Sequence, residues 1–264
     1  MTSSQILTSD MHHALSNREM RLLYQPKYDV QTHEIRSAEA LLRWDHPAYG
    51  VLPPEAFIRI AERNGMIIDI GDWVINEACR QMGEWRTHGI AEFGIAVNVS
   101  VRQLAGDHLF SVVCDAIRRH GIEPGLLTIE LTETSAMHDF AASIEILQKL
   151  VGLGVRISID DFGTGYSSLM YLKRLPAAEL KIDRGFMVDV PNEGSTIVAA
   201  IVALGRALKM QVVAEGVETH AQQAFLSRLG CHAMQGFLFG KPVAPDALMQ
   251  IRRNFAVNGV YPDR

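Results

Sequence analysis

The sequence has few cysteines and no long apolar run. Its 264 residues include three cysteines, Cys79, Cys114 and Cys231, which lie far apart and form no C-x-x-C pair. This spacing argues against both a disulfide scaffold and a zinc-binding knuckle, and it favours a reducing compartment. Residues 1–10 are polar, and no stretch of about 18 uninterrupted apolar residues occurs. We therefore expect no membrane insertion and a cytoplasmic location.

An excess of positive charge is also missing. The chain carries 25 Lys and Arg residues against 30 Asp and Glu residues, which gives a formal net charge of −5. This sign argues against a protein that grips long nucleic acid through its phosphates. A small phosphate ligand stays compatible with the charge if cations help to bind it.

The composition is that of a folded protein, with 48% apolar and 21% charged residues. Short runs rich in Val and Ile alternate with longer segments in which apolar residues recur every three or four positions. Such alternation is typical of βα units that feed a parallel sheet. The chain length and the number of expected strands predict an α/β fold, a TIM-like (β/α)8 barrel.

Strands are predicted near residues 21–26, 34–42, 94–99, 126–131, 155–160, 178–182, 211–215 and 233–239. Outer helices are predicted at 54–63, 69–86, 109–120, 140–150, 167–174, 195–209, 220–229 and 245–254. We expect residues 1–20 to form a lead-in with one or two helical turns, and 21–264 to form a single barrel domain. Only residues 27–33 join the first two strands, which is too short for a crossover helix. These strands should pair antiparallel and make the barrel irregular at its start.

A polar or charged residue stands near the end of most expected strands, namely Glu39, Asn98, Glu130, Asp160, Lys181, Glu215 and Gln235. In a βα barrel the carboxyl ends of the strands form the rim on which active sites are built, so these side chains should converge. Strand alternation agrees, because the apolar neighbours of Glu130 and Lys181 would face the helices. The alternative interpretation is a set of structural ion pairs at one barrel end. Charges facing inward are costly unless they are paired or bound to a metal.

Carboxylates outnumber cations in this set, where Lys181 alone faces Glu39, Glu130, Asp160, Glu215 and the adjacent Asp161. Such repulsion favours a metal, and oxygen ligands with an Asn carbonyl favour Mg²⁺ or Mn²⁺. Neighbouring residues of a regular strand point apart, so Asp160 and Asp161 both reach metal only if the strand ends between them. Gly163 and Gly165 would make that turn easy. Two adjacent carboxylates could serve two metals, the arrangement used in phosphodiester cleavage.

Seven motifs occur in order along the chain: AEALLRWDHP around Glu39, NVSVRQL at 98–104, IELTET at 129–134, IDDFGTGYSSL at 159–169, LKID at 180–183, VVAEGVE at 212–218 and QGFLFGKP at 235–242. Together they resemble the EAL-domain cyclic di-GMP phosphodiesterases from about residue 20 to 250. The resemblance implies a metal-dependent hydrolase that converts cyclic di-GMP to linear pGpG and so lowers the level of this second messenger.

The resemblance also implies a role for each site residue. Two Mg²⁺ or Mn²⁺ ions would be bound by Glu39, Asn98, Glu130, Asp160 and Asp161, and Glu215 would add a metal or water contact as a candidate base. Lys181 would hold the attacking water, and Gln235 would support that water or the site. Arg43, Leu41 and Asp183 form the expected substrate-binding set. For Arg43 the residues alone leave an alternative, an ion pair with Asp45 or another neighbour.

Glu133 and the 162–168 loop, with Phe162, Gly163, Thr164 and Gly165, resemble the family's loop that links the active site to a dimer interface. The resemblance therefore implies a homodimer. Family members commonly carry sensory or receiver modules, so an unidentified regulatory protein is a further partner to test for.

Two other functions compete with hydrolysis. One is a catalytically inactive EAL module that acts as a cyclic di-GMP receptor or a protein-interaction domain. Its usual mark would be lost metal ligands, and none is lost here. The other is a barrel lyase or aldolase with Lys181 as a Schiff-base nucleophile, which would need a desolvated lysine rather than one among carboxylates.

Overall fold

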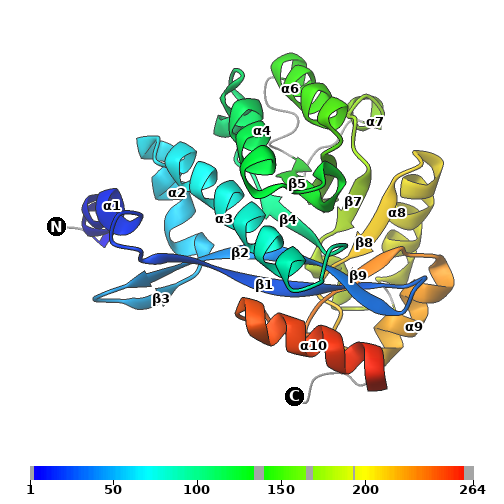
Figure 1. Ribbon diagram of the computed structural model, residues 1–264. Coiled ribbons are helices and arrows are strands. Elements are labelled where there is room, and N and C mark those ends of the chain that lie inside the picture. Colours follow the sequence, from blue (N-terminus) through cyan, green and yellow to red (C-terminus); the bar gives the residue numbers. More distant parts are fainter. Residues whose placement is uncertain (1–2, 134–139, 165–168, 193, 259–264) are drawn as a thin grey trace.

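The computed structural model describes residues 3–133, 140–164, 169–192 and 194–258. Eight strands close into a barrel in the order β1-β9-β8-β7-β6-β5-β4-β2, and pairing of β1 with β2 completes the ring, while β3 extends β2 outside it (Figure 1). The strands are β1 (Met20–Asp29), β2 (Glu34–His46), β3 (Gly50–Leu52), β4 (Gly94–Asn98), β5 (Leu127–Thr132), β6 (Arg156–Phe162), β7 (Glu179–Ile182), β8 (Gln211–Ala214) and β9 (Ala233–Gln235). The predicted eight-stranded barrel is confirmed.

The first strand runs against all the others of the ring. β1 is antiparallel to both β2 and β9, whereas every other pair of neighbours in the ring is parallel. The predicted antiparallel start is therefore confirmed. The strand continues to Asp29, past its expected end at residue 26, because its last three residues pair with β9.

A bulge interrupts the pairing of β1 with β2. Lys27 lies opposite Ser37 and Tyr28 opposite Ile35, so Arg36 is one extra residue on β2. Lys27 and Tyr28 are both buried. The Tyr28 ring stacks on Phe239 with the ring centroids 4.8 Å apart, whereas the ammonium of Lys27 lies inside the barrel.

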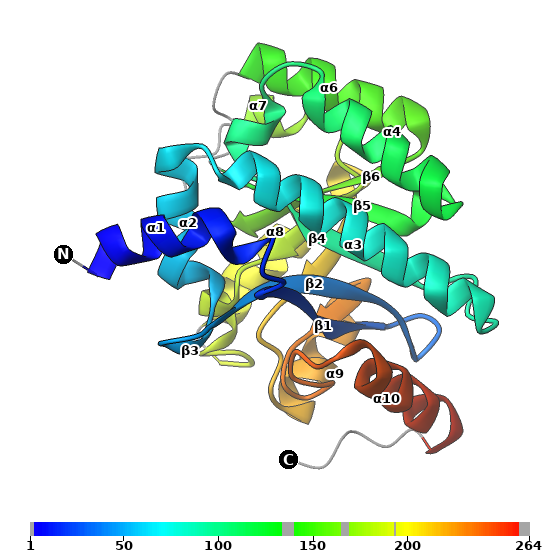
Figure 2. The same cartoon turned by 60° about the vertical axis from the view of Figure 1, so that its left-hand side comes forward.

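Helices cover the outside of the barrel (Figure 2). They are α1 (Ser3–Ala14), α2 (Pro54–Asn64), α3 (Ile67–Thr87), α4 (His108–His120), α6 (Phe140–Leu153), α7 (Leu169–Leu172), α8 (Ser195–Ala207), α9 (His220–Leu229) and α10 (Pro245–Asn258), with 3₁₀ turns at Val101–Leu104, Pro124–Leu126 and Arg184–Met187. Within the described ranges, no helix is both long and apolar enough to cross a lipid bilayer.

The strand side chains that face the helices make the hydrophobic core. Leu180 and Ile182 of β7 are fully buried, as are Ile129 and Leu131 of β5. Helix α8 approaches the wall closely at Gly205, where a Cβ atom would lie 2.3 Å from a methyl carbon of Val212. A larger residue at position 205 would therefore push this helix off the barrel.

Three parts of the fold differ from the sequence expectation. The lead-in forms a full helix, α1, because Met11 and Ala14 pack into the same core as the barrel. The short strand β3 was not expected, and it forms by pairing with the end of β2. Strand β9 ends at Gln235 instead of residue 239, because Gly236 lies against the Val217 backbone, so closely that a Cβ atom there would lie 2.1 Å from the Val217 carbonyl oxygen.

Candidate active site

The seven polar residues predicted at the rim converge on the mouth of the barrel. Asn98, Asp160, Lys181 and Gln235 lie in the last residues of β4, β6, β7 and β9, and Glu215 directly follows β8. Glu130 lies two residues before the end of β5. Glu39 does not close its strand, because β2 continues to His46, where it pairs with β3. Its side chain still reaches the same place, in the middle of the longer strand.

Lys181 is the centre of this cluster. Its Nζ lies 2.7 Å from Glu215 Oε1, 2.8 Å from Glu130 Oε2, 3.0 Å from Asp160 Oδ2 and 3.3 Å from Glu39 Oε2. The side chain is fully buried. Burial lowers the pKa of a lysine, but the surrounding carboxylates outweigh it and hold the pKa of Lys181 well above its usual value. The lysine is therefore a fixed cation, which argues against Schiff-base chemistry.

Asp160 and Asp161 reach the mouth together through a β-bulge. Ile159 pairs with Leu180 and Phe162 with Ile182, so both aspartates lie opposite the single residue Lys181. The backbone of Asp161 is left-handed, with φ of 53°. This corrects the expectation that the strand ends between them: β6 continues to Phe162, and the bulge re-aims the second carboxylate, as bulges near active sites do.

Two groups of carboxylates have the spacing of a metal site. Glu39, Glu130 and Asp160 form one group, and Asp160, Asp161 and Glu215 form the other; in each, one oxygen per residue lies within 4.8 Å of the others. Asp160 belongs to both, which fits a carboxylate shared between two ions. The donor set is all oxygen, as Mg²⁺ and Mn²⁺ require.

The electrostatics of the mouth favour added positive charge. Burial raises the pKa values of Glu39, Asp161 and Glu215. Neighbouring carboxylates, Asp160 among them, raise these pKa values further despite the opposing effect of Lys181. The pKa of Glu215 reaches about 8. A raised pKa means that these carboxyl groups bind protons more tightly than usual when no other cation is present. A divalent cation would compete with those protons.

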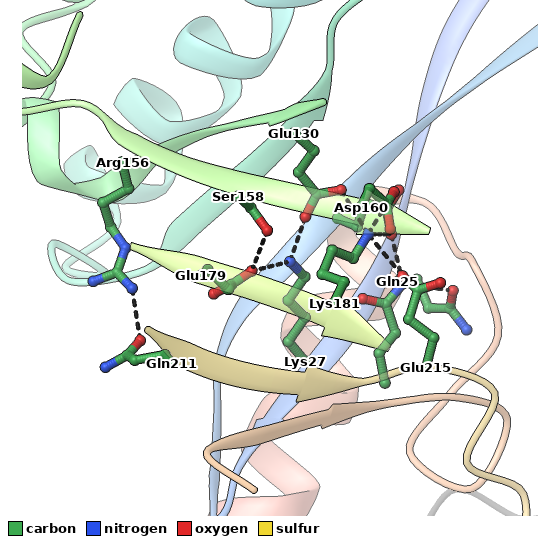
Figure 3. Close-up of polar contacts among 12 residues, drawn as sticks. Gln25, Lys27, Glu130, Arg156, Ser158, Asp160, Glu179, Lys181, Gln211 and Glu215 are labelled. Atoms are coloured by element: carbon green, nitrogen blue, oxygen red, sulfur yellow. Dashed lines mark hydrogen bonds and ion pairs between the residues drawn. The ribbon is translucent and has the colours of Figure 1, made fainter. Parts of the chain in front are cut away.

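A second buried lysine, which the sequence analysis missed, lies beneath the cluster. The Nζ of Lys27 is 2.6 Å from Glu130 Oε1 and 3.5 Å from Glu179 Oε1, and Ser158 donates to that same Glu179 oxygen (Figure 3). Lys181 is therefore not the only cation facing the carboxylates. Burial raises the pKa of a carboxyl group, but the two lysines together hold the pKa of Glu130 at about 2.

Amide side chains hold the Glu39 carboxylate along one side of the mouth. Gln235 Nε2 donates to Glu39 Oε2 at 2.7 Å and to Gln25 Oε1 at 2.9 Å, and Asn98 Nδ2 donates to Glu39 Oε1 at 2.6 Å. Gln25 was not predicted, although it lies directly opposite Glu39 in the β1–β2 pair. The Asn98 amide oxygen is the atom that a metal would use.

The mouth opens into a cleft of about 500 Å³. Its lining includes Leu41 and Asp183 of the expected substrate-binding set, together with Arg184 and Phe237, which were not predicted. Arg43 lies beyond this lining, two residues further along β2, where it donates to the Leu42 carbonyl oxygen at 2.7 Å. Its alternative partner, Asp45, pairs instead with Arg21 at 2.7 Å.

The expected link from the site to a neighbouring loop is partly described. Glu133 is buried, and its Oε2 accepts a hydrogen bond from the Gly163 backbone N–H at 2.9 Å. Phe162 is buried at the end of β6, and the Thr164 hydroxyl donates to the Asp161 carbonyl oxygen at 2.8 Å. Gly165 lies outside the described residues. Glu133 thus contacts the segment that directly follows Asp161.

The closed barrel and its carboxylate-lined mouth have the form of an active site with candidate metal ligands. Comparison with known proteins shows the family. The EAL domain model matches residues 8–242, so this chain belongs to the EAL domain family. MucR of Pseudomonas aeruginosa, a bifunctional diguanylate cyclase/cyclic di-GMP phosphodiesterase, is 52% identical over 92% of this chain and 36% of its own length. PdeR of Escherichia coli, a cyclic di-GMP phosphodiesterase, is 40% identical over 90% of this chain and 36% of its own length.

A solved structure of the PaMucR phosphodiesterase in a c-di-GMP complex superposes with a TM-score of 0.88 at 52% identity, covering 92% of this chain and 99% of that one. The chain spans about a third of the length of the curated relatives that it matches.

Proposed function

We propose that this chain is a phosphodiesterase that hydrolyses cyclic di-GMP to linear pGpG with two Mg²⁺ or Mn²⁺ ions. The observation that carries the proposal is the pair of carboxylate groups around Lys181, which share Asp160. The similarity to MucR, which has been solved with c-di-GMP, supports the choice of substrate. The complete set of candidate ligands favours hydrolysis over the inactive receptor.

The charges of the site fit two divalent ions. At the mouth, Lys181 faces five carboxylates, namely Glu39, Glu130, Asp160, Asp161 and Glu215, while Lys27 and Glu179 offset each other beneath it. If all are ionised, four negative charges remain without a counter-charge, which two divalent cations would balance. In this proposal the ions are held by Glu39, Asn98, Glu130, Asp160, Asp161 and Glu215. When bound, they supply Lewis-acid activation of water and neutralise the substrate phosphate.

The residues of the chain then complete the chemistry. Lys181 donates a hydrogen bond that orients the attacking water, and Gln235 holds the Glu39 carboxylate from the other side. Glu215, whose Oε1 lies 2.7 Å from the Lys181 Nζ, accepts a proton from that water once the cations have displaced its own. Leu41 and Asp183 line the cleft that receives the nucleotide, and Arg43 contacts a phosphate of a substrate that extends beyond it.

The direct test is incubation of the chain with cyclic di-GMP and Mg²⁺ or Mn²⁺, followed by chromatography. We expect pGpG to appear, to require added metal and to be suppressed by Ca²⁺, because the larger ion tolerates looser coordination and activates water less well. Undiminished turnover after exhaustive chelation contradicts the metal mechanism. Binding of cyclic di-GMP without hydrolysis in the presence of either metal would favour the receptor.

We further propose a homodimer through the surface next to the loop that follows Asp161. The short helix α7 presents Leu169, Met170 and Tyr171 to solvent, with exposed fractions of 58%, 72% and 43%. Large apolar side chains exposed side by side are typical of protein–protein contacts. A second copy seated there would restrain the segment that Glu133 holds. Light scattering over a dilution series, with specific activity measured in parallel, tests the dimer and its coupling to activity.

A further inference from the structure

The buried contacts beneath the mouth assign a role to Lys27 that hydrolysis alone does not require. Glu130 has both carboxylate oxygens occupied, Oε1 by Lys27 at 2.6 Å and Oε2 by Lys181 at 2.8 Å. The Glu130 side chain is 0% exposed and that of Lys27 is 4% exposed, so water does not compete strongly for these contacts. The two lysines therefore divide the oxygens of one carboxylate between them.

The two contacts point to different parts of the barrel. Lys181 also contacts Glu39, Asp160 and Glu215, so Oε2 of Glu130 belongs to the mouth. Lys27 instead contacts Glu179, and Ser158 donates to the same Glu179 oxygen at 3.0 Å. Figure 3 shows Lys27 between Glu130 and Glu179, on the side away from Asp160 and Glu215. Lys27 and Glu179 also line a cleft of about 420 Å³ that contains Arg156 and Gln211.

We propose that Lys27 is a positioning residue, which holds Oε1 of Glu130 so that Glu130 offers a single oxygen, Oε2, to a metal ion at the mouth. A carboxylate with two available oxygens can chelate an ion, which changes the number and angles of its ligands. Mg²⁺ demands near-ideal octahedral geometry, so a chelating Glu130 would disturb the site. The inference rests on the proposed function only in taking Glu130 as a metal ligand.

A simpler role for Lys27 is that of a counter-ion. Glu130 and Glu179 are buried, and a buried carboxylate without a cation costs several kcal/mol. A counter-ion role predicts that loss of Lys27 lowers stability but leaves each folded molecule with normal metal geometry and turnover. A positioning role predicts that turnover and metal geometry change even where stability is restored.

Three variants separate these roles. Lys27→Met keeps the length of the side chain and removes its charge. Lys27→Met combined with Glu179→Gln also removes the carboxylate that the first change leaves without its cation, so stability should partly recover. Glu179→Gln alone is the matched control, because it leaves the contact between Lys27 and Glu130 in place. Each variant is measured for melting temperature, for kcat and KM, and for the EPR spectrum of bound Mn²⁺.

We expect Lys27→Met to lower kcat by about 10- to 100-fold with little change in KM, as is usual for residues that orient metal ligands. The EPR spectrum of bound Mn²⁺ should change as well. The double variant should keep both defects despite its higher melting temperature, and Glu179→Gln should show neither. If Lys27→Met does not fold, the double variant carries the same comparison.

Recovery of kcat together with stability in the double variant overturns the inference, as does a wild-type Mn²⁺ spectrum in either Lys27→Met protein. The spectrum reports the metal site whether or not the enzyme turns over. If wild-type protein binds Mn²⁺ but does not hydrolyse cyclic di-GMP, the proposed function is wrong. The EPR spectra of the variants would still decide whether Lys27 positions Glu130.

Discussion

Lys181 and its neighbours Leu180 and Ile182 are all fully buried, yet they face opposite sides of the barrel wall. The same contrast holds in β5, where Glu130 lies between Ile129 and Leu131. Side chains that face the helices are apolar, and each gains roughly 1.5–3 kcal/mol from burial. The charged groups that face inward cost several kcal/mol each to dehydrate, which their partners offset only in part.

The two faces of the barrel wall therefore have separate roles, one in stability and the other in the chemistry of the site. The outer layer can carry the free energy of folding because its strand side chains, such as those of Leu180 and Ile129, are apolar and need no charged partner. The inner layer can hold more carboxylates than cations, despite their mutual repulsion, because the apolar outer layer keeps the strands in place. Four measurements test this division.

The largest effect is expected from Asp160→Asn. Asp160 belongs to both carboxylate groups and contacts Lys181, so its loss removes charge from both ion sites while almost no volume is lost. We expect turnover to fall by at least about 100-fold, with the circular dichroism spectrum and the melting temperature nearly unchanged. Asp115→Asn, at an exposed ion pair with Arg118, is the matched control. Wild-type rates in Asp160→Asn would mean that Asp160 is not a ligand.

Leu180→Ala tests the outer layer one residue away from Lys181. The Leu180 side chain is fully buried, and it packs near α8 at Gly205. We expect the free energy of unfolding to fall by about 2–5 kcal/mol, with kcat of the folded protein unchanged. Denaturant titration and assays well below the transition measure the two quantities. A large loss of kcat in fully folded Leu180→Ala would show that the two layers are not separable.

The pH dependence of metal binding tests the inner layer. The pKa of Glu215 is raised to about 8, and those of Glu39 and Asp161 are also raised, so the folded, metal-free protein holds protons on groups that the metal must displace. Apparent affinity for Mn²⁺ should therefore rise between pH 6 and pH 8, by about tenfold per pH unit for each displaced proton, and then level off. Calorimetry measures both affinity and proton release. Glu215→Gln should flatten the slope, and an affinity independent of pH would contradict the raised pKa values.

The smallest effect is expected from Glu133→Ala. Its carboxylate holds the Gly163 N–H, two residues beyond Asp161, without itself belonging to either carboxylate group. Loss of the hydrogen bond should loosen this segment and lower activity by a few fold, more strongly at dilutions at which the proposed dimer dissociates. Assays over a concentration series measure the effect. A monomer at every concentration, with constant specific activity, would refute the coupling.

The sequence predicted the barrel and five of its strands within two residues at both ends, because alternation of apolar and polar residues reports which face of a strand is buried. It also predicted the mouth carboxylates, since parallel strands bring their ends together. Two features of the site followed from tertiary pairing instead. Lys27 was assigned to the connection between the first two strands, whereas β1 continues through it by pairing with both β2 and β9. The bulge at Asp161 depends on a backbone conformation that no local residue pattern specifies.

Some of the site residues that the sequence analysis missed could have been found from the alternation of side chains along their strands. Glu179 lies two positions before Lys181 on the same strand, so alternation places both inside the barrel. Gln25 and Lys27 likewise alternate within β1. Which residues Gln25 and Lys27 contact across the barrel can be predicted only once the direction of β1 is known. That direction decides which of the two side chains lies at the mouth.

The extra residue Arg36 gives the first hairpin a fixed length, and this length sets how deep Lys27 sits below Glu130. A one-residue slip of β2 relative to β1 would turn Glu39 and the later side chains of β2 to the other face of the wall. We therefore expect insertions and deletions in this hairpin to be less well tolerated than substitutions, because they change the register of β2 against β1.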